Sequence, residues 1–226
     1  MNTLSYKIGF WSAILLLSVF IGWTICFVGI VSTTPLFCWT NLSDYLAFEK
    51  AHSQIFQYIA KFLMFIFGPL YVLLINSFYD YASDNRKTLI RISLLFAMAF
   101  AILSSLHYFV QLSSVRLNIA QGNTDGLEHF VQANPNSIMT SIDMLGWTLF
   151  LGLSSFFVSP VFTGNKLNKT MRYAFIFNGL SCFLAGIGYV FQINVLTFLF
   201  INLGVGGALI IVSITSIKLF KQLKSE

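Results

Sequence analysis

Charged residues are scarce in this sequence, and their scarcity excludes a soluble globular protein. Asp, Glu, Lys and Arg make up 9% of the 226 residues and hydrophobic residues 57%, whereas a soluble domain carries about 25% charged residues. The formal net charge is +5, but the basic residues form short clusters between apolar runs rather than one polar face. That distribution argues against a nucleic-acid partner.

Cysteine is also rare, and the sequence lacks motifs for cofactors. Cys26, Cys38 and Cys182 lie far apart without CxxC spacing, so neither a redox pair nor a metal knuckle is predicted. The chain contains no phosphate-binding loop, nucleophile motif or dinucleotide fingerprint. We therefore predict no cofactor.

Long apolar runs recur along the whole chain, and each is long enough to cross a hydrocarbon core of about 30 Å as a helix. We predict one all-α membrane domain over residues 1–226, a bundle of six transmembrane helices. Turn residues such as Asn134-Pro135 and Gly164-Asn165 separate the runs, and only the joint at Ile193-Asn194 is tight. The predicted spans are Gly9 to Val31, Ile55 to Phe78, Leu89 to Gln111, Ile138 to Val161, Met171 to Gln192 and Val195 to Leu219.

The distribution of Lys and Arg predicts that both termini are cytoplasmic. Cytoplasmic loops of membrane proteins carry an excess of basic residues. Ten of the thirteen basic residues fall on the side of the two termini, namely Lys7, Arg86, Lys87, Arg91, Lys166, Lys169, Arg172, Lys218, Lys221 and Lys224. The predicted location is the cell inner membrane, where the chain contacts membrane lipid on all sides.

The two outer loops, residues 32–54 and 112–137, are long for connections between neighbouring spans. Ser43 to Gln54 has apolar residues near helical spacing, so we expect an interfacial helix running into the second span. Asp125 to Gln132 is predicted as another short helix that roofs the bundle. Pro69 should kink or break the second span because its ring removes a backbone donor.

Two pairs of segments echo each other along the chain. Spans one and four share a Gly-Trp-Thr motif followed by Pro and Phe, and spans two and five share Gly, Tyr-Val and Ile-Asn. Spans one and four would have opposite orientations, as would spans two and five, which is the pattern of an inverted 3+3 repeat. Chance matching in Phe- and Gly-rich helices is the alternative explanation.

No ionisable residue lies near the middle of a predicted span, which counts against a proton-driven transporter. Lys61, His107 and Asp143 instead lie about 22–25 Å from the basic ends of their helices. Three spans therefore place them in one outer layer, where Lys61 and Asp143 are predicted to form an ion pair with His107 beside them. The alternative is that these side chains only reach the lipid headgroup region.

Further polar residues extend this predicted layer. Tyr108 and Gln111 continue the face of His107, and Glu49 with His52 is expected to lean over it from the first outer loop. All three histidines are on the outer side, but their spacing is not that of a zinc site, and no metal site is predicted.

The second half of the chain resembles a group of uncharacterised bacterial membrane proteins. The resemblance runs from Leu145-Gly146-Trp147 through Gly152, Asn165-Lys166 and Gly179–Cys182 to Ala185–Tyr189. These proteins have six or seven passes and belong to a family defined by a domain of unknown function. The resemblance implies a bacterial inner membrane and carries no activity.

Three functional hypotheses follow. The first is an outward-facing pocket that binds a small amphipathic or lipid-like molecule, since polar groups ring the mouth of an aromatic-rich bundle. The second is a secondary transporter built on the inverted repeat, with helix breaks at Gly68-Pro69 and Gly186–Gly188. The third is an intramembrane enzyme that uses His107 with Asp143 or Glu49 as acid and base.

Overall fold

The computed structural model describes residues 3–225, and within this range the chain is helical with no strand. Six helical segments are long and apolar enough to cross a membrane, which confirms the predicted multi-pass helical bundle. Three spans are single helices: the first is α1 (Thr3–Thr33), the second α3 (Ile55–Ser77) and the fifth α8 (Lys166–Val190). The third span runs from η1 (Asp84–Arg86) through α4 (Lys87–Val110) and η2 (Gln111–Val115) to α5 (Arg116–Gln121), and the fourth from α6 (Ile138–Leu145) through η4 (Gly146–Phe150) and α7 (Leu151–Val158) to η5 (Ser159–Val161). The sixth runs from α9 (Asn194–Phe198) through η6 (Leu199–Val205) to α10 (Gly206–Ser225). Outside them lie α2 (Leu42–Ala51) and the single turn η3 (Leu127–His129).

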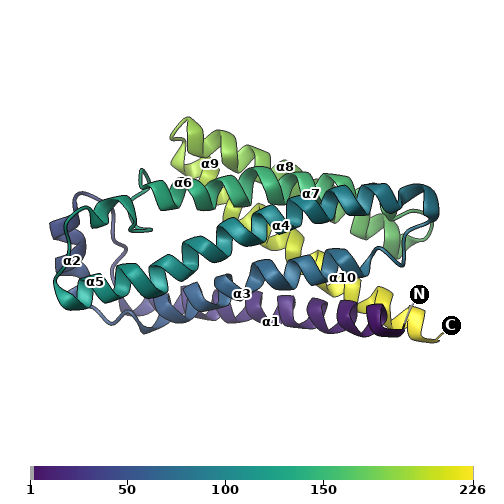
Figure 1. The fold of residues 1–226 in the computed structure, drawn as a ribbon, viewed down its shortest axis with the longest axis horizontal. Helices are drawn as coiled ribbons and strands as arrows, with labels where there is room; N and C mark the ends of the chain where they lie inside the picture. Colours follow the sequence, from purple (N-terminus) through teal and green to yellow (C-terminus); the bar gives the residue numbers. More distant parts are fainter. Residues whose placement is uncertain (1–2, 226) are drawn as a thin grey trace.

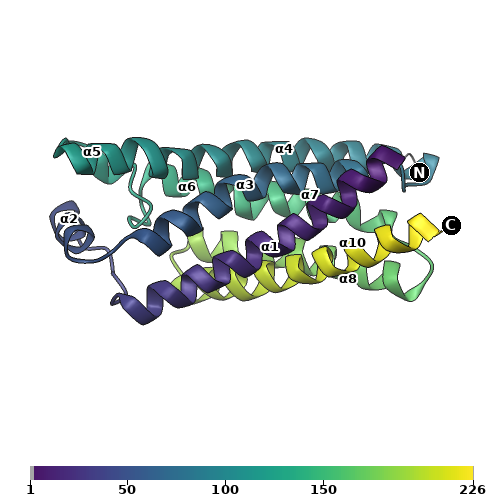
Figure 2. The same cartoon turned by 90° about the horizontal axis from the view of Figure 1, so that it is seen from below.

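The two ends of the bundle differ. Both ends of the chain lie at one end, here called the terminal end, and α2 and α5 lie at the opposite, distal end (Figure 1). In the same view α10 approaches α1 near the termini, and the sixth span separates from α1 toward α9 (Figure 1). Figure 2 shows α1 crossing α3 obliquely along the bundle. The first and sixth spans therefore diverge toward the distal end.

Side-chain caps fix where several helices begin. Asn41 accepts a hydrogen bond from the backbone N–H of Asp44 at 2.9 Å at the start of α2. Ser137 accepts one from Thr140 at 3.1 Å before α6, and Asn165 caps α8 in the same way. Such caps satisfy backbone donors that the first helical turn leaves free. The polar residues between the apolar runs thus set the span boundaries.

The two helix breaks that the transporter hypothesis expected are not present. The helix α3 runs unbroken through Pro69, and α8 runs unbroken through Gly186 and Gly188. Just before the ring, Gly68 lets α3 and α4 approach closely, since a Cβ there would lie 2.8 Å from Ala101 Cα.

The interruptions lie instead in π-helical turns of three spans. The turns are η2, η4 and η6, in the third, fourth and sixth spans. A π turn adds one residue to the helix and rotates the side chains that follow, and such turns are frequent at functional sites. Sequence periodicity does not reveal them, because the apolar character continues through each turn.

The outer loops also differ in part from expectation. The first contains α2 as predicted, but the helix ends at Ala51 and does not run into α3. The third span continues helically to Gln121, ten residues beyond its predicted end at Gln111, so the second loop begins at Gly122. Its expected helix from Asp125 to Gln132 is only the turn η3.

The hairpin between the last two spans is confirmed. The helix α8 ends at Val190 and α9 begins at Asn194. Gln192 adopts a positive φ of 56°, and the backbone N–H of Ile193 donates to the carbonyl of Gly188 at 2.7 Å. The chain therefore reverses within three residues.

Candidate ligand-binding site

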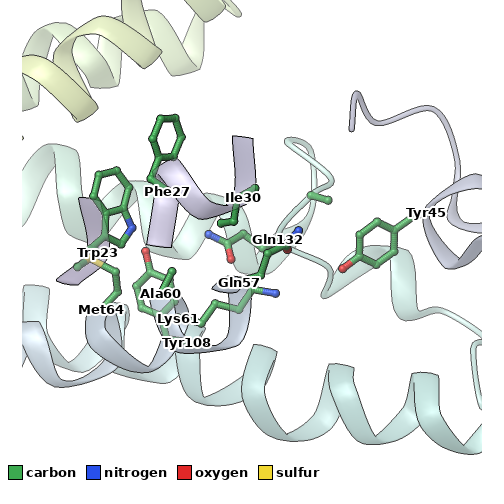
Figure 3. Close-up of a pocket in the computed structure, with 11 residues that line it drawn as sticks. Trp23, Phe27, Ile30, Tyr45, Gln57, Ala60, Lys61, Met64, Tyr108 and Gln132 are labelled. Carbon is green, nitrogen blue, oxygen red and sulfur yellow. The ribbon is translucent and has the colours of Figure 1, made fainter. Parts of the chain in front are cut away.

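A cavity of about 240 Å³ lies at the distal end between α1, α3 and α4. We call it the distal chamber. Its lining is mostly aromatic and apolar, with one cation, and comprises Trp23, Phe27, Ile30, Tyr45, Gln57, Ala60, Lys61, Met64, Tyr108, Gln132 and Ala133. In Figure 3, Tyr45 of α2 lies at the end of the chamber away from Trp23. The interfacial helix thus contributes to its distal wall.

A second cavity of about 280 Å³, the central chamber, adjoins the first. It lies between α1, the fourth span and η6, and its lining includes one carboxyl group. The lining residues are Phe20, Trp23, Met64, Tyr108, Gln132, Thr140, Asp143, Met144, Trp147, Ile201, Asn202 and Val205. Both chambers are close to the lower end of the roughly 300–1,000 Å³ that ligand pockets occupy.

The two chambers share a wall and differ in depth. Trp23, Met64, Tyr108 and Gln132 line both. Along α1, the distal chamber reaches Ile30 and the central chamber reaches Phe20, a difference of about 15 Å at 1.5 Å per residue. A molecule that occupied both would extend from the distal end toward the middle of the bundle.

Lys61 lines the distal chamber, and its side chain is not paired with an acid. Only 9% of the residue is exposed, and its Nζ lies 5.6 Å from the ring centroid of Tyr58. Within residues 3–225 the ion pairs involve Lys87, His107 and His129 and not Lys61. The predicted ion pair between Lys61 and Asp143 is therefore wrong, because Lys61 lines the distal chamber and Asp143 the central one.

Asp143 is held within the fourth span. Its Oδ1 accepts a hydrogen bond from Trp147 Nε1 at 3.1 Å, one helical turn away. Its Oδ2 lies 3.9 Å from Nε2 of His107, a distance too long for a hydrogen bond. Asp143 is 7% exposed and reaches the central chamber.

His107 is fully buried behind Asp143. Its Nδ1 lies 3.0 Å from the carbonyl oxygen of Met139. A carbonyl oxygen only accepts, so Nδ1 carries the proton, and Nε2 of a neutral ring presents a lone pair. Nε2 meets the geometric criteria for a hydrogen bond with no protein atom, although the Gln132 side chain lies near the ring, so the imidazole and the carboxyl group face each other without direct contact.

Gln111 fastens the second outer loop to the bundle. Its Nε2 donates to the carbonyl of Phe130 at 2.6 Å, and its Oε1 accepts from the backbone N–H of Gln132 at 3.1 Å. Val131, between them, is fully buried. Gln111 does not line either chamber, whereas Tyr108, predicted on the same face, lines both. These two hydrogen bonds hold Gln132 in the wall that the distal and central chambers share.

Glu49 and His52 do not reach either chamber. Both line a separate groove of about 600 Å³ on the distal surface, although the charge of Glu49 still acts on Lys61. Glu49 accepts a hydrogen bond from the Tyr45 hydroxyl at 2.7 Å, and the His52 ring packs on Phe48. Burial, together with the charge of Glu49, raises the pKa of Tyr45, so its hydroxyl stays protonated and donates to that carboxylate.

Several lining residues were not predicted as site residues. Trp147 could have been found from its i, i+4 spacing to Asp143. Gln132 could not, because a loop residue gives no sequence signal of the wall it joins. Among the described residues, no group of three or more His, Cys, Asp or Glu side chains is close enough to hold a metal ion.

Comparison with known proteins gives no matching family, no matching curated protein and no matching solved structure.

Proposed function

We propose that this protein binds a small amphipathic or lipid-like molecule in the distal and central chambers. The observation that carries the proposal is the pair of adjoining cavities with a shared aromatic wall, one containing Lys61 and the other Asp143. A site of this kind suits a molecule with an apolar body and few polar groups. The charged group near the distal end and the apolar surface deeper in match the two parts of an amphiphile.

The proposal includes an orientation with the chambers in the outer half of an inner membrane. Both termini share one end of the bundle (Figure 1), and ten of the thirteen basic residues belong to that side of the six-span arrangement. The positive-inside rule assigns such a side to the cytoplasm. The resemblance of the second half to bacterial inner-membrane proteins is the reason for choosing that membrane.

Native mass spectrometry of the full chain, released from its membrane in mild detergent, tests the proposal. The wild type is expected to retain one amphipathic molecule per chain. Ala60 lines the distal chamber, so Ala60→Phe should fill it and displace that molecule. Ala51 is exposed on α2, and Ala51→Phe is the matched control. A wild type without any bound molecule, or equal retention by Ala60→Phe, would contradict the proposal.

A second candidate function rests on the facing groups of His107 and Asp143. Asp143 lines the central chamber and the buried His107 Nε2 lies 3.9 Å from its Oδ2, so a substrate hydroxyl in that chamber could exchange a proton with Asp143 while His107 positions the carboxyl group. The test is incubation of the purified chain with extracted membrane lipids. A product formed by the wild type and absent with His107→Gln and Asp143→Asn would support it, and an unchanged lipid profile would exclude it for those lipids.

A transporter built on an inverted repeat stays a prediction. The expected helix breaks would have been its main support, and α3 and α8 are continuous at both positions. The repeat itself rests on the sequence echo alone. We therefore rank it below ligand binding.

A further inference from the structure

Lys61 is a buried basic residue whose side chain borders an open cavity. A buried ammonium group without a counter-ion costs several kcal/mol of desolvation free energy. The Tyr58 ring lies 5.6 Å from Nζ, where a cation–π contact contributes only about 0.5–2 kcal/mol, and Glu49 attracts the ammonium group only from beyond ion-pair distance. The protein itself therefore leaves most of this cost without compensation.

The acidic residues nearest the two chambers form hydrogen bonds with other residues and not with Lys61. Glu49 accepts from the Tyr45 hydroxyl and lies in the distal groove. Asp143 accepts from Trp147 and borders the central chamber. No ion pair within the described residues joins either carboxylate to Lys61. Lys61 therefore has no direct counter-ion among the described residues, only the more distant charge of Glu49, and it borders an open cavity.

A second donor lines the chamber beside Lys61. Gln57 lies one helical turn before Lys61 on α3 and lines the same cavity. An amide and an ammonium at i, i+4 project from one helix face. Together they present donors to an oxygen-rich anion, the arrangement found where proteins bind carboxylate or phosphate.

The central chamber offers a route from the bilayer. It lies between Phe20 of α1 and Asn202 of η6, where the first and sixth spans diverge (Figure 1). Asn202 is partly exposed, and its neighbour Leu203 is 66% exposed. The lining thus includes residues of both diverging spans, one of them partly exposed at the lipid-facing side of the bundle.

We propose that the bound molecule is an anionic amphiphile whose phosphate or carboxylate group binds Lys61 in the distal chamber. Its apolar chain occupies the central chamber and reaches the bilayer between α1 and η6. This inference rests on the proposed function and adds the chemical class of the ligand. The shared chemistry is an oxyanion, and the mostly apolar lining of the adjoining central chamber favours a membrane lipid over a soluble anion as its source.

The test compares two lipids with the same acyl chains, one with an anionic phosphoglycerol headgroup and one with an uncharged hydroxyl group in its place. The full wild-type chain is exposed in detergent micelles to equal amounts of dioleoyl phosphatidylglycerol and dioleoylglycerol, and retention is measured by native mass spectrometry. The wild type should retain the phosphatidylglycerol about tenfold or more in excess, as a charge-assisted hydrogen bond predicts. Equal retention would overturn the anionic class and leave the proposed function intact. Retention of neither lipid would overturn both.

Variants and a soluble competitor complete the experiment. Lys61→Met should lower phosphatidylglycerol retention to the level of dioleoylglycerol, and Lys61→Arg should preserve the excess. Lys50 is exposed on α2, so Lys50→Met is the matched control and should leave the excess unchanged. Loss of the excess in Lys50→Met as well would overturn the assignment to Lys61. Displacement of the lipid by sodium phosphate would overturn the lipid source, and the comparison of lipids on the wild type needs no variant to fold.

Discussion

The indole Nε1 of Trp147 donates a hydrogen bond of 3.1 Å to Oδ1 of Asp143, one turn earlier in the fourth span. Trp147 lies in the π turn η4, and Asp143 lies in the α-helical segment before it. Both side chains line the central chamber. The bond gives a buried carboxyl group a partner within its own helix and fixes the ring that forms part of the chamber wall.

Replacing Asp143 should separate the role of its acceptor oxygen from that of its acidity. Asp143→Asn keeps an oxygen for the Trp147 N–H, whereas Asp143→Leu leaves that donor buried without a partner. Loss of a buried partner costs about 1–3 kcal/mol. The leucine variant should therefore unfold more easily than the asparagine variant by about that amount, measured by denaturation in one detergent. Equal stability of the two variants would show that the hydrogen bond contributes nothing.

Gln111→Leu should release the second outer loop from the bundle. The substitution removes the acceptor and the donor that hold Phe130 and Gln132. Backbone amides from residue 130 to 132 should then exchange about tenfold faster or more, since a lost buried partner costs about 1–3 kcal/mol. Hydrogen exchange with mass spectrometry measures this.

Asn118→Leu is the control for that exchange experiment. Asn118 bonds only to the carbonyl of Ser114 within its own helical segment, so its loss should not change exchange in the loop. If the amides of residues 130–132 of the wild type already exchange like those of an unstructured peptide, the loop is mobile and the hydrogen bonds of Gln111 do not hold it on the bundle.

Gly68→Ala should destabilise the bundle, and Gly207→Ala should not. A Cβ at Gly68 would lie 2.8 Å from Ala101 Cα, a backbone atom that cannot move aside, whereas a Cβ at Gly207 meets nothing within 4 Å. Overpacking costs about 1–3 kcal/mol, while alanine in a helix gains up to about 1 kcal/mol over glycine. The thermal midpoints of both variants in one detergent test this, and a midpoint for Gly68→Ala at or above the wild type would refute the close approach.

Cysteine accessibility tests the orientation. Ser43→Cys and Asn123→Cys should react with an impermeant reagent in intact cells, because both positions belong to outer loops. Lys87→Cys and Lys166→Cys should react only after the cytoplasmic face is opened. Labelling of Lys87→Cys from outside would reverse the topology and place the chambers in the inner leaflet.

The number and place of the spans could be predicted because they depend on apolar length and on caps. Turn residues such as Asn165 are visible in the sequence, and Asn165 does begin α8. The extension of the third span to Gln121 was missed, because residues 112–121 are polar enough to suggest a loop. A helix that projects beyond the membrane needs no apolar run, so hydropathy does not mark its end.

The sequence predicted how far along the bundle the polar residues lie better than it predicted which of them line the same cavity. Lys61 and Asp143 both border cavities, but in separate chambers, since depth along a helix says nothing about the direction in which a side chain points. The three π turns rotate the faces that follow them, so helical spacing from Asp143 or Tyr108 could not be carried across the bundle. Glu49 lies beside the distal chamber rather than in its lining, because α2 turns its carboxylate toward the Tyr45 hydroxyl.

The most direct test of the account is a cryo-electron microscopy map of the full chain in lipid nanodiscs, with an antibody fragment bound for alignment. The account predicts continuous density that is not protein, running from Lys61 past Trp23 and leaving between α1 and η6. A map in which both chambers are empty, or in which side chains close them, would contradict ligand binding at this site.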